Sequence, residues 1–212
     1  MIHAVRSMPG GGQLLVWRTV ESPDALLGEL HLPENLADYH ALRSAKRQME
    51  FLGTRVALKR LLGEEFHIFY ETSGKPLLHD RCYSISVSHS REWVAVAIHP
   101  SISVGVDIEC PTDKVLRVYH KFLHKAELDM LSDRVGIQPL QIIWSGKEAL
   151  YKIIGEEAVD FAAQMRMLPF EVAGAGDVTM EHLPTGMLYR AHYIQNELYT
   201  LVYCLGGGQN ER

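Results

Sequence analysis

Apolar residues recur along the chain at two spacings, which predict blocks of strands and helices. Alternation of apolar and polar positions in the first half predicts four strands, at residues 13–20, 66–71, 83–87 and 93–98. Apolar residues three or four apart predict helical structure over residues 33–62, with a break near Ser44 and an end at Gly63. The same reasoning in the second half predicts a strand at 104–108, helices at 115–131 and 139–154, and strands at 168–172, 187–193 and 198–205.

Each half of the chain therefore combines helices with a small, mostly antiparallel sheet. The order of elements recurs, although no repeat of individual residues is present. We predict an α+β fold of two similar halves, each a small sheet packed with helices, comprising residues 1–103 and 104–212.

Composition and charge are those of an ordinary globular protein. The 212 residues are 47% hydrophobic and 22% charged, and 26 acidic against 21 basic residues give a net charge of -5. This balance provides no excess of positive charge that would attract a phosphodiester backbone, so we expect no nucleic-acid binding. The three cysteines lie far apart and indicate neither a disulfide framework nor a zinc site. Without a secretory leader or a long apolar run, we expect a cytoplasmic protein with no membrane association.

The segment 144–152, WSGKEALYK, carries charged and aromatic side chains on the polar side of a predicted helix. Glu148 and Lys152 are four residues apart, so their side chains can meet. A solvated ion pair is the simple explanation. However, Trp144 and Tyr151 fall on the same side, and two large aromatic residues there favour a face that meets another surface or a cleft.

A pair of acids lies near the end of the predicted strand at 104–108. Asp107 and Glu109 are two residues apart and therefore project to the same side of a strand. Carboxylates suit Mg²⁺, which prefers oxygen ligands and retains water and phosphate oxygens. Two acids that face water on an edge strand are the commoner explanation, whereas a third carboxylate such as Glu148 makes a metal site.

A third cluster is the serine-rich segment SISVSHS at 84–90. Alternation places Ser84, Ser86 and Ser88 on one face, with His89 just beyond the strand end. Hydroxyls, turn amides and an imidazole suit a phosphate, although a capped turn and a structural histidine are the alternatives. No P-loop or dinucleotide-binding glycine motif is present.

In chain order, GKP (74–76), SVSHS (86–90), VGVDIE (104–109) and WSGKEALYK (144–152) resemble the motifs of the 4'-phosphopantetheinyl transferase superfamily, of the surfactin-synthetase-activating (Sfp) type. The stretch FLHKAE (122–127) resembles the family's segment between the last two motifs. The resemblance extends over roughly residues 40–155.

This resemblance implies an enzyme that transfers the 4'-phosphopantetheine group of coenzyme A to a serine of an apo acyl or peptidyl carrier protein. The reaction is a Mg²⁺-dependent post-translational modification that releases adenosine 3',5'-bisphosphate. The fold implied is two stacked α+β units with coenzyme A in the cleft between them. The N-terminal half then meets the nucleotide, and the C-terminal half carries the metal and the catalytic helix. A monomer is the simpler assumption.

The resemblance also implies roles for individual residues. Asp107, Glu109 and Glu148 correspond to the magnesium-binding acids, and Lys152 to the lysine near the transferred phosphate. Catalysis would rest on Glu148, Lys152 and Asp107, with either Glu148 or water as the base for the serine. Coenzyme A would be held by a larger set, which comprises Ser88, His89, Lys75, Lys152 and, at the 3'-phosphate, Lys46 and Arg47 with Arg55 in reserve.

Two other functions remain open at this point. Water in place of the carrier serine would make a Mg²⁺-dependent pyrophosphatase that acts on coenzyme A or related nucleotides. A degenerate relative would bind carrier proteins or coenzyme A without catalysis. For a transferase, residues 115–123 form a candidate docking surface, because apolar side chains lie there beside Arg117 and Lys121. An ordinary amphipathic helix packed on the core is the alternative.

Overall fold

The computed structural model describes residues 2–78, 82–131, 135–155, 159–207 and 209–210, and it confirms the α+β fold class. The chain forms two compact units, Met1–Ser101 and Ile102–Arg212, which we call unit 1 and unit 2. Their boundary lies close to the one predicted at residues 103 and 104. Among the described helices, none combines the length and apolar character that a bilayer crossing requires.

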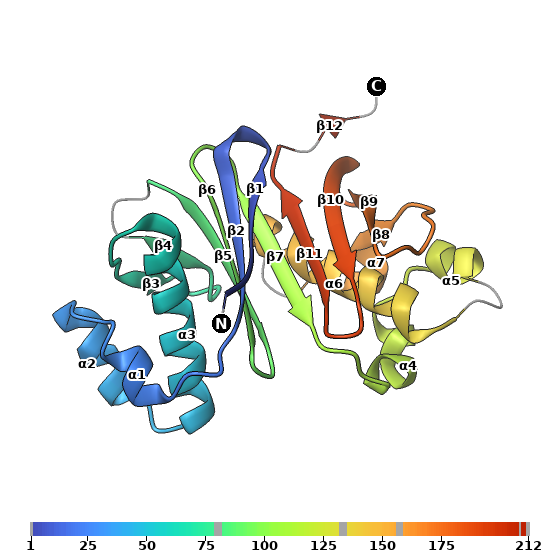
Figure 1. Ribbon diagram of the computed structural model, residues 1–212. Coiled ribbons are helices and arrows are strands. Elements are labelled where there is room, and N and C mark those ends of the chain that lie inside the picture. Colours follow the sequence, from blue (N-terminus) through green and yellow to red (C-terminus); the bar gives the residue numbers. More distant parts are fainter. Residues whose placement is uncertain (1, 79–81, 132–134, 156–158, 208, 211–212) are drawn as a thin grey trace. The chain divides into compact units, whose positions relative to one another are not determined.

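Unit 1 is built on a four-stranded antiparallel sheet with strand order β1-β2-β6-β5 (Figure 1). Its strands are β1 (Ile2–Met8), β2 (Gly12–Arg18), β5 (Ser84–Ser90) and β6 (Trp93–His99), and a separate hairpin pairs β3 (Ile68–Tyr70) with β4 (Pro76–Leu78). The helices are α1 (Pro23–Leu27), α2 (Pro33–Ala41) and α3 (Ala45–Leu62). Leu52 and Val56 of α3 share one apolar cluster with Trp17, Val94 and Val96 of the sheet. Helix α3 is thereby fixed against the strands.

The predicted break near Ser44 separates α2 from α3. The backbone is extended at Leu42 and Ser44, and the Ser44 side chain accepts a hydrogen bond from the backbone N–H of Arg47. An N-cap of this kind satisfies an amide that the first helical turn leaves without a partner. At the other end, Gly63 adopts a left-handed conformation with φ of 78° and ends α3 as predicted.

The glycine run at residues 10–12 makes the turn between β1 and β2. Gly10 has φ of 73°, and a Cβ atom at Gly12 would lie 2.7 Å from the ring of His99. The His99 ring lies within hydrogen-bonding distance of the carbonyl of Pro9 and accepts a hydrogen bond from the backbone N–H of Ser101. The glycines therefore make room for a histidine that links this turn to the end of unit 1.

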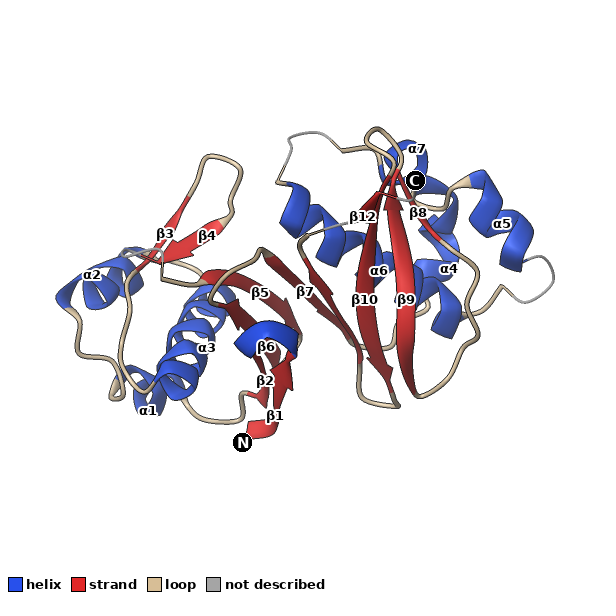
Figure 2. Ribbon diagram, turned by 90° about the horizontal axis from the view of Figure 1, so that it is seen from above, coloured by secondary structure: helices blue, strands red, loops and turns tan. Residues whose placement is uncertain are grey.

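Unit 2 has a larger antiparallel sheet with strand order β7-β11-β10-β9-β8. Its strands are β7 (Val104–Glu109), β8 (Met165–Met167), β9 (Ala175–His182), β10 (Met187–Gln195) and β11 (Thr200–Leu205), with β12 (Gln209–Asn210) paired to β10. The helices are α4 (Lys114–Val118), α5 (Lys125–Leu131), α6 (Ile137–Ile154) and α7 (Phe161–Gln164), with a 3-10 turn, η2 (Tyr119–Lys121). Helix α6 packs along the sheet and contacts most of its strands (Figure 2).

Two sequence-based expectations for unit 2 are wrong. Residues 115–131 do not form one helix but break into α4, η2 and α5. At the start of α5 the Glu127 side chain accepts a hydrogen bond from the backbone N–H of His124, which caps a new helix there. Residues 168–172 are not a strand, since β8 already ends at Met167 and Pro169 has no N–H to donate to a ladder. The patterns at β1, β4, β9 and α1 were too weak to predict these elements.

Close packing of α6 on β7 depends on Gly105. A Cβ atom built on Gly105 would lie 1.9 Å from the carbonyl oxygen of Ala149, which is far inside van der Waals contact. On the helix, a Cβ atom at Gly146 would lie 2.6 Å from the end of the Met167 side chain, so Gly146 leaves space for that methionine. The glycine of the GVDIE motif therefore lets the backbone of α6 approach the strand directly.

We predict that Gly105→Ala destabilises unit 2 by about 1–3 kcal/mol or more, because the helix must shift to admit one methyl group. The matched control is Gly174→Ala, where the nearest neighbour of the added Cβ, the Gln195 carbonyl oxygen, lies 3.8 Å away. Urea unfolding followed by circular dichroism measures both. Equal midpoints for the two variants would contradict this account of the close approach.

Candidate active site

The predicted acids and lysine of unit 2 come from β7 and α6, the two elements that Gly105 brings together. Asp107 lies two residues after Gly105 on the same side of β7 and is 5% exposed. The ammonium of Lys152 on α6 lies 3.1 Å from Asp107 Oδ1 and donates a hydrogen bond of 2.7 Å to the carbonyl of Val106. The residues of two motifs separated by more than thirty positions thus form one ion pair.

Glu148 lies one helical turn before Lys152 and shares this environment. Burial raises the pKa of the Glu148 carboxyl to about 7, and the negative charges of Asp107 and Glu109 act in the same direction, whereas Lys152 opposes them. Glu148 is therefore close enough to Asp107 and Glu109 for their charges to act on it. A group of acids held together in this way binds a cation or a proton readily.

Carboxylate oxygens are the donors that Mg²⁺ prefers, so the chemistry of Asp107, Glu109 and Glu148 fits that ion. In this structure the Asp107 carboxylate is paired with Lys152. Among the described residues, no three His, Cys, Asp or Glu side chains stand in an arrangement that encloses a metal ion. The donor set thus fits magnesium by its chemistry, whereas its arrangement here is that of an ion pair beside two further acids.

A second ion pair, which the sequence analysis did not single out, fixes α6 from its buried side. The side chains of Lys147 and Glu127 are both fully buried, with Lys147 Nζ 2.6 Å from Glu127 Oε2. Burial lowers the pKa of the Lys147 ammonium, whereas the charge of Glu127 raises it. A signal was present, because Ile143, Lys147 and Leu150 follow the spacing of one helix face and put a lysine on the apolar stripe.

A cavity of about 520 Å³ lies beside Glu148 in unit 2. The rings of Phe122, Trp144 and Phe161 line it, and the Trp144 ring centroid lies 5.1 Å from that of Phe122 and 5.7 Å from that of Phe161. The remaining lining residues are Val118, Lys121, Val159 and Asp160. This cavity, which we call the aromatic cavity, explains the aromatic side chains on the polar side of α6, since Trp144 faces it beside Glu148.

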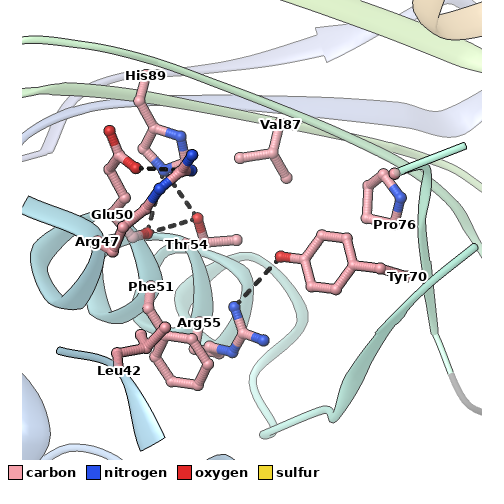
Figure 3. Close-up of a pocket in the computed structure, with 11 residues that line it drawn as sticks. Leu42, Arg47, Glu50, Phe51, Thr54, Arg55, Tyr70, Pro76, Val87 and His89 are labelled. Carbon is pink, nitrogen blue, oxygen red and sulfur yellow. Dashed lines mark hydrogen bonds and ion pairs between the residues drawn. The ribbon is translucent and has the colours of Figure 1, made fainter. Parts of the chain in front are cut away.

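Unit 1 has a cavity of its own, about 330 Å³ in volume, between α3, the β3–β4 hairpin and β5 (Figure 3). It brings together parts of three segments that the sequence analysis selected: the helix with Arg47 and Arg55, the GKP turn and the serine-rich strand. Its lining residues are Leu42, Arg47, Glu50, Phe51, Thr54, Arg55, Tyr70, Gly74, Pro76, Val87 and His89. We call it the basic cavity.

Arg55 is the buried cation of the basic cavity. Its guanidinium carbon lies 3.4 Å from the centroid of the Phe51 ring, and its side chain donates to the hydroxyl of Tyr70 at 3.5 Å (Figure 3). Arg55 is 3% exposed, and its Nε has no hydrogen-bond partner among the described residues. Burial lowers the pKa of the guanidinium. A buried arginine with an unused donor is a strong site for an anion.

His89 also lines the basic cavity, but it is not beyond the strand end as expected. Strand β5 extends to Ser90, so His89 lies within the ladder opposite Val94. Its Nε2 is 2.9 Å from the Thr54 hydroxyl and 3.1 Å from the carbonyl of Glu50. The strand is longer than predicted because the hairpin with β6 continues up to the tight turn at Arg91, which has φ of 52°.

The other predicted coenzyme A residues lie around the basic cavity in different ways. Arg47 lines it and pairs with Glu50, whereas the 83% exposed side chain of Lys46 pairs with the same glutamate without lining it. Lys75 is flanked by two lining residues of the GKP turn, and Ser88 is buried on β5. Phe51, Thr54 and Tyr70 are lining residues that the sequence analysis missed, and Arg55, held in reserve, is a deeply buried cation of this cavity.

Comparison with known protein families matches residues 103–200 to the 4'-phosphopantetheinyl transferase superfamily (ACPS). The match lies wholly within unit 2 and includes β7 and α6, with Asp107, Glu109, Glu148 and Lys152. This part of the chain is thus similar to a superfamily of transferases. No curated protein matches the chain.

We predict that the metal-free protein loses stability as the pH rises from about 4.5 to 7, owing to Glu148. Below 4.5 its carboxyl is protonated in both the folded and the unfolded state, whereas between the two pKa values only the folded state retains the proton. Glu148→Gln removes this loss. The variant should therefore melt at a higher temperature than the wild type at pH 8, with a smaller difference at pH 4.5.

Thermal unfolding in the presence of a chelator measures this difference. Glu197→Gln, an exposed glutamate of the same unit, is the matched control. A stability gain for Glu148→Gln that is the same at both pH values would contradict the proposed cause, which is the burial of the Glu148 carboxyl beside the charges of Asp107 and Glu109.

Proposed function

We propose that the protein is a 4'-phosphopantetheinyl transferase of the surfactin-synthetase-activating type, a holo-carrier-protein synthase. It transfers the 4'-phosphopantetheine group of coenzyme A to a serine of an apo acyl or peptidyl carrier protein and releases adenosine 3',5'-bisphosphate. The observation that carries this proposal is the β7–α6 pair, in which three acids and Lys152 lie together inside the part of the chain that matches the superfamily. We assign it to the cytoplasm, as a monomer, with no nucleic-acid or membrane partner.

The basic cavity is the proposed site for the nucleotide end of coenzyme A. Phe51 and Tyr70 offer aromatic surface to a base, and Arg55 offers its unused donor to a phosphate. Arg47 and His89 also line the cavity, and Lys46, Lys75 and Ser88 complete the set that we assign to coenzyme A. The nucleotide is then bound by unit 1, which leaves the diphosphate and the pantetheine arm for unit 2.

The acids of β7 and α6 are the proposed chemical centre. Asp107, Glu109 and Glu148 would hold Mg²⁺, which when bound neutralises the charge of the diphosphate. The Lys152 ammonium exchanges its ion pair with Asp107 for one with the transferred phosphate, and so stabilises the negative charge of that phosphate. The hydroxyl proton of the carrier serine needs an acceptor, and we assign it to Glu148, which lines the aromatic cavity, or to a water molecule beside it. The serine oxygen then attacks the phosphorus, and the bond to the bisphosphate breaks.

The carrier protein is proposed to dock on residues 115–123. Leu116 and Val118 of α4 are each 38% exposed. Arg117 is exposed on the same helix, and Val118 and Lys121 also line the aromatic cavity. The basic side chains suit an acidic carrier, and the apolar ones can anchor it next to Glu148.

The direct test mixes the protein with coenzyme A, Mg²⁺ and several apo carrier proteins, and follows the carriers by intact-mass spectrometry. We expect one carrier to gain the mass of a single phosphopantetheine group. Release of free phosphopantetheine without a carrier, faster than any transfer, would instead identify a pyrophosphatase. Tight binding of coenzyme A without either product would identify a binding protein.

We predict that Asp107→Ala and Glu148→Ala each lower the transfer rate at least about 100-fold, because each removes a charge that the transition state requires. The rate is measured with the carrier that responds in the mass assay. Glu197→Ala, outside the proposed centre, is the control. Rates near that of the wild type for both Asp107→Ala and Glu148→Ala would refute the assignment of the acids.

We predict that Arg55→Met weakens binding of adenosine 3',5'-bisphosphate about 10- to 100-fold, the scale of a lost charged hydrogen bond. Isothermal titration calorimetry measures this affinity in the absence of any carrier. The matched control is Arg43→Met, because Arg43 is exposed and does not line the basic cavity. If both variants bind like the wild type, the nucleotide does not use the basic cavity.

A further inference from the structure

The ammonium of Lys147 has more partners than its ion pair with Glu127. Four oxygens surround Nζ, and three of them are backbone carbonyls from different parts of unit 2. The distances are 2.6 Å to Glu127 Oε2, 2.6 Å to the carbonyl of Phe122, 2.9 Å to that of Met165 and 3.1 Å to that of Phe161. An ammonium with its three N–H donors shared among four oxygens is strongly constrained in position.

Two of these carbonyls belong to residues whose rings line the aromatic cavity. Phe122 and Phe161 are thus held at their backbones by Lys147 and contacted at their rings by Trp144. Trp144 and Lys147 are three residues apart on α6, so the same turn of one helix holds both phenylalanines. The next residue after Lys147 is Glu148, which lines the same cavity.

We propose that Lys147 is a positioning residue, whose ammonium holds the carbonyls of Phe122 and Phe161 and so sets the shape of the aromatic cavity beside Glu148. The inference rests on the proposed function, in which the carrier serine meets Glu148 at this cavity. Lys147 itself touches no substrate, because its side chain is fully buried. It acts through the position of Phe122, Trp144 and Phe161.

A purely stabilising role of the Lys147–Glu127 pair is the competing explanation, and a double variant separates the two. Lys147→Met alone leaves Glu127 as a buried charge without a partner, which destabilises the fold. Combination with Glu127→Gln removes both charges, and the glutamine keeps one acceptor oxygen for the two backbone N–H groups, of His124 and Met167, that donate to Glu127. The double variant should therefore be more stable than Lys147→Met alone, while the carbonyls of Phe122 and Phe161 remain without their ammonium.

The first readout needs no enzymatic activity. Labelling with 5-fluorotryptophan gives three ¹⁹F signals, from Trp17 and Trp93 in unit 1 and Trp144 in unit 2. In the double variant we expect the Trp144 signal to shift or broaden while the other two stay unchanged. Lys125→Met, the same substitution at an exposed position of unit 2, is the matched control and should leave all three signals in place.

The second readout is the kinetics of transfer. Because misplacement of a site by about an ångström can cost on the order of 100-fold, we expect the double variant to lower kcat at least 10-fold. Its affinity for adenosine 3',5'-bisphosphate should remain within about twofold of the wild type, since that ligand is assigned to unit 1. This split distinguishes a positioning role from general loss of fold.

A double variant with restored melting temperature, an unchanged Trp144 signal and the wild-type kcat would overturn the inference. A second outcome is a displaced Trp144 signal in the double variant together with a wild-type protein that transfers to no carrier. This outcome would support the positioning role and refute the proposed function instead. The two failures are therefore distinguishable.

Discussion

The structure of unit 2 depends on one buried interaction, the contact of the Lys147 ammonium with Glu127 and three backbone carbonyls. The charged group has no access to water, so its desolvation is offset only if every donor meets an oxygen. This requirement fixes the rotation of α6 about its axis. The orientation of α6 in turn directs the side chains of Glu148 and Lys152 toward the end of β7.

The second constraint is the absence of a side chain at Gly105. It allows the backbone of α6 to contact β7 directly, and it brings Asp107, two residues further on, to Lys152. The cost of this arrangement is visible in the raised pKa of Glu148, which reflects first the burial of its carboxyl and then the negative charges of Asp107 and Glu109. Strain of this electrostatic kind is typical of functional sites, because a bound cation relieves it. The glycine and the acids of the GVDIE motif therefore serve the same arrangement.

Local signals in the sequence predicted much of the fold. The N-cap at Ser44, the left-handed ends at Gly63 and Gly155 and the apolar stripe of α6 are set by neighbouring residues, and the α+β class follows from them. Two features were not predicted. The break between α4 and α5 accompanies the hydrogen bond from the His124 backbone to Glu127, and β8 ends at Met167, before Pro169.

For the candidate site, motif spacing selected the acids and Lys152, whereas Phe51, Thr54, Tyr70 and Lys147 emerged only in three dimensions. Phe51 and Tyr70 come from separate elements, so nothing in either segment indicates their common cavity. Lys147 did have a sequence signal, a lysine at an apolar position of a helix, as did Arg55 between Phe51 and Leu58. A charge on a buried stripe therefore indicates a role that an exposed charge does not.

The central claim is that Asp107, Glu109 and Glu148 form one binding site for a divalent ion. Titration of the protein with Mn²⁺, followed by electron paramagnetic resonance in the presence of coenzyme A, tests it most directly. The account predicts one bound ion per chain in the wild type and none at the same concentration in Asp107→Asn. Undiminished binding in that variant, or no binding in the wild type, would contradict it.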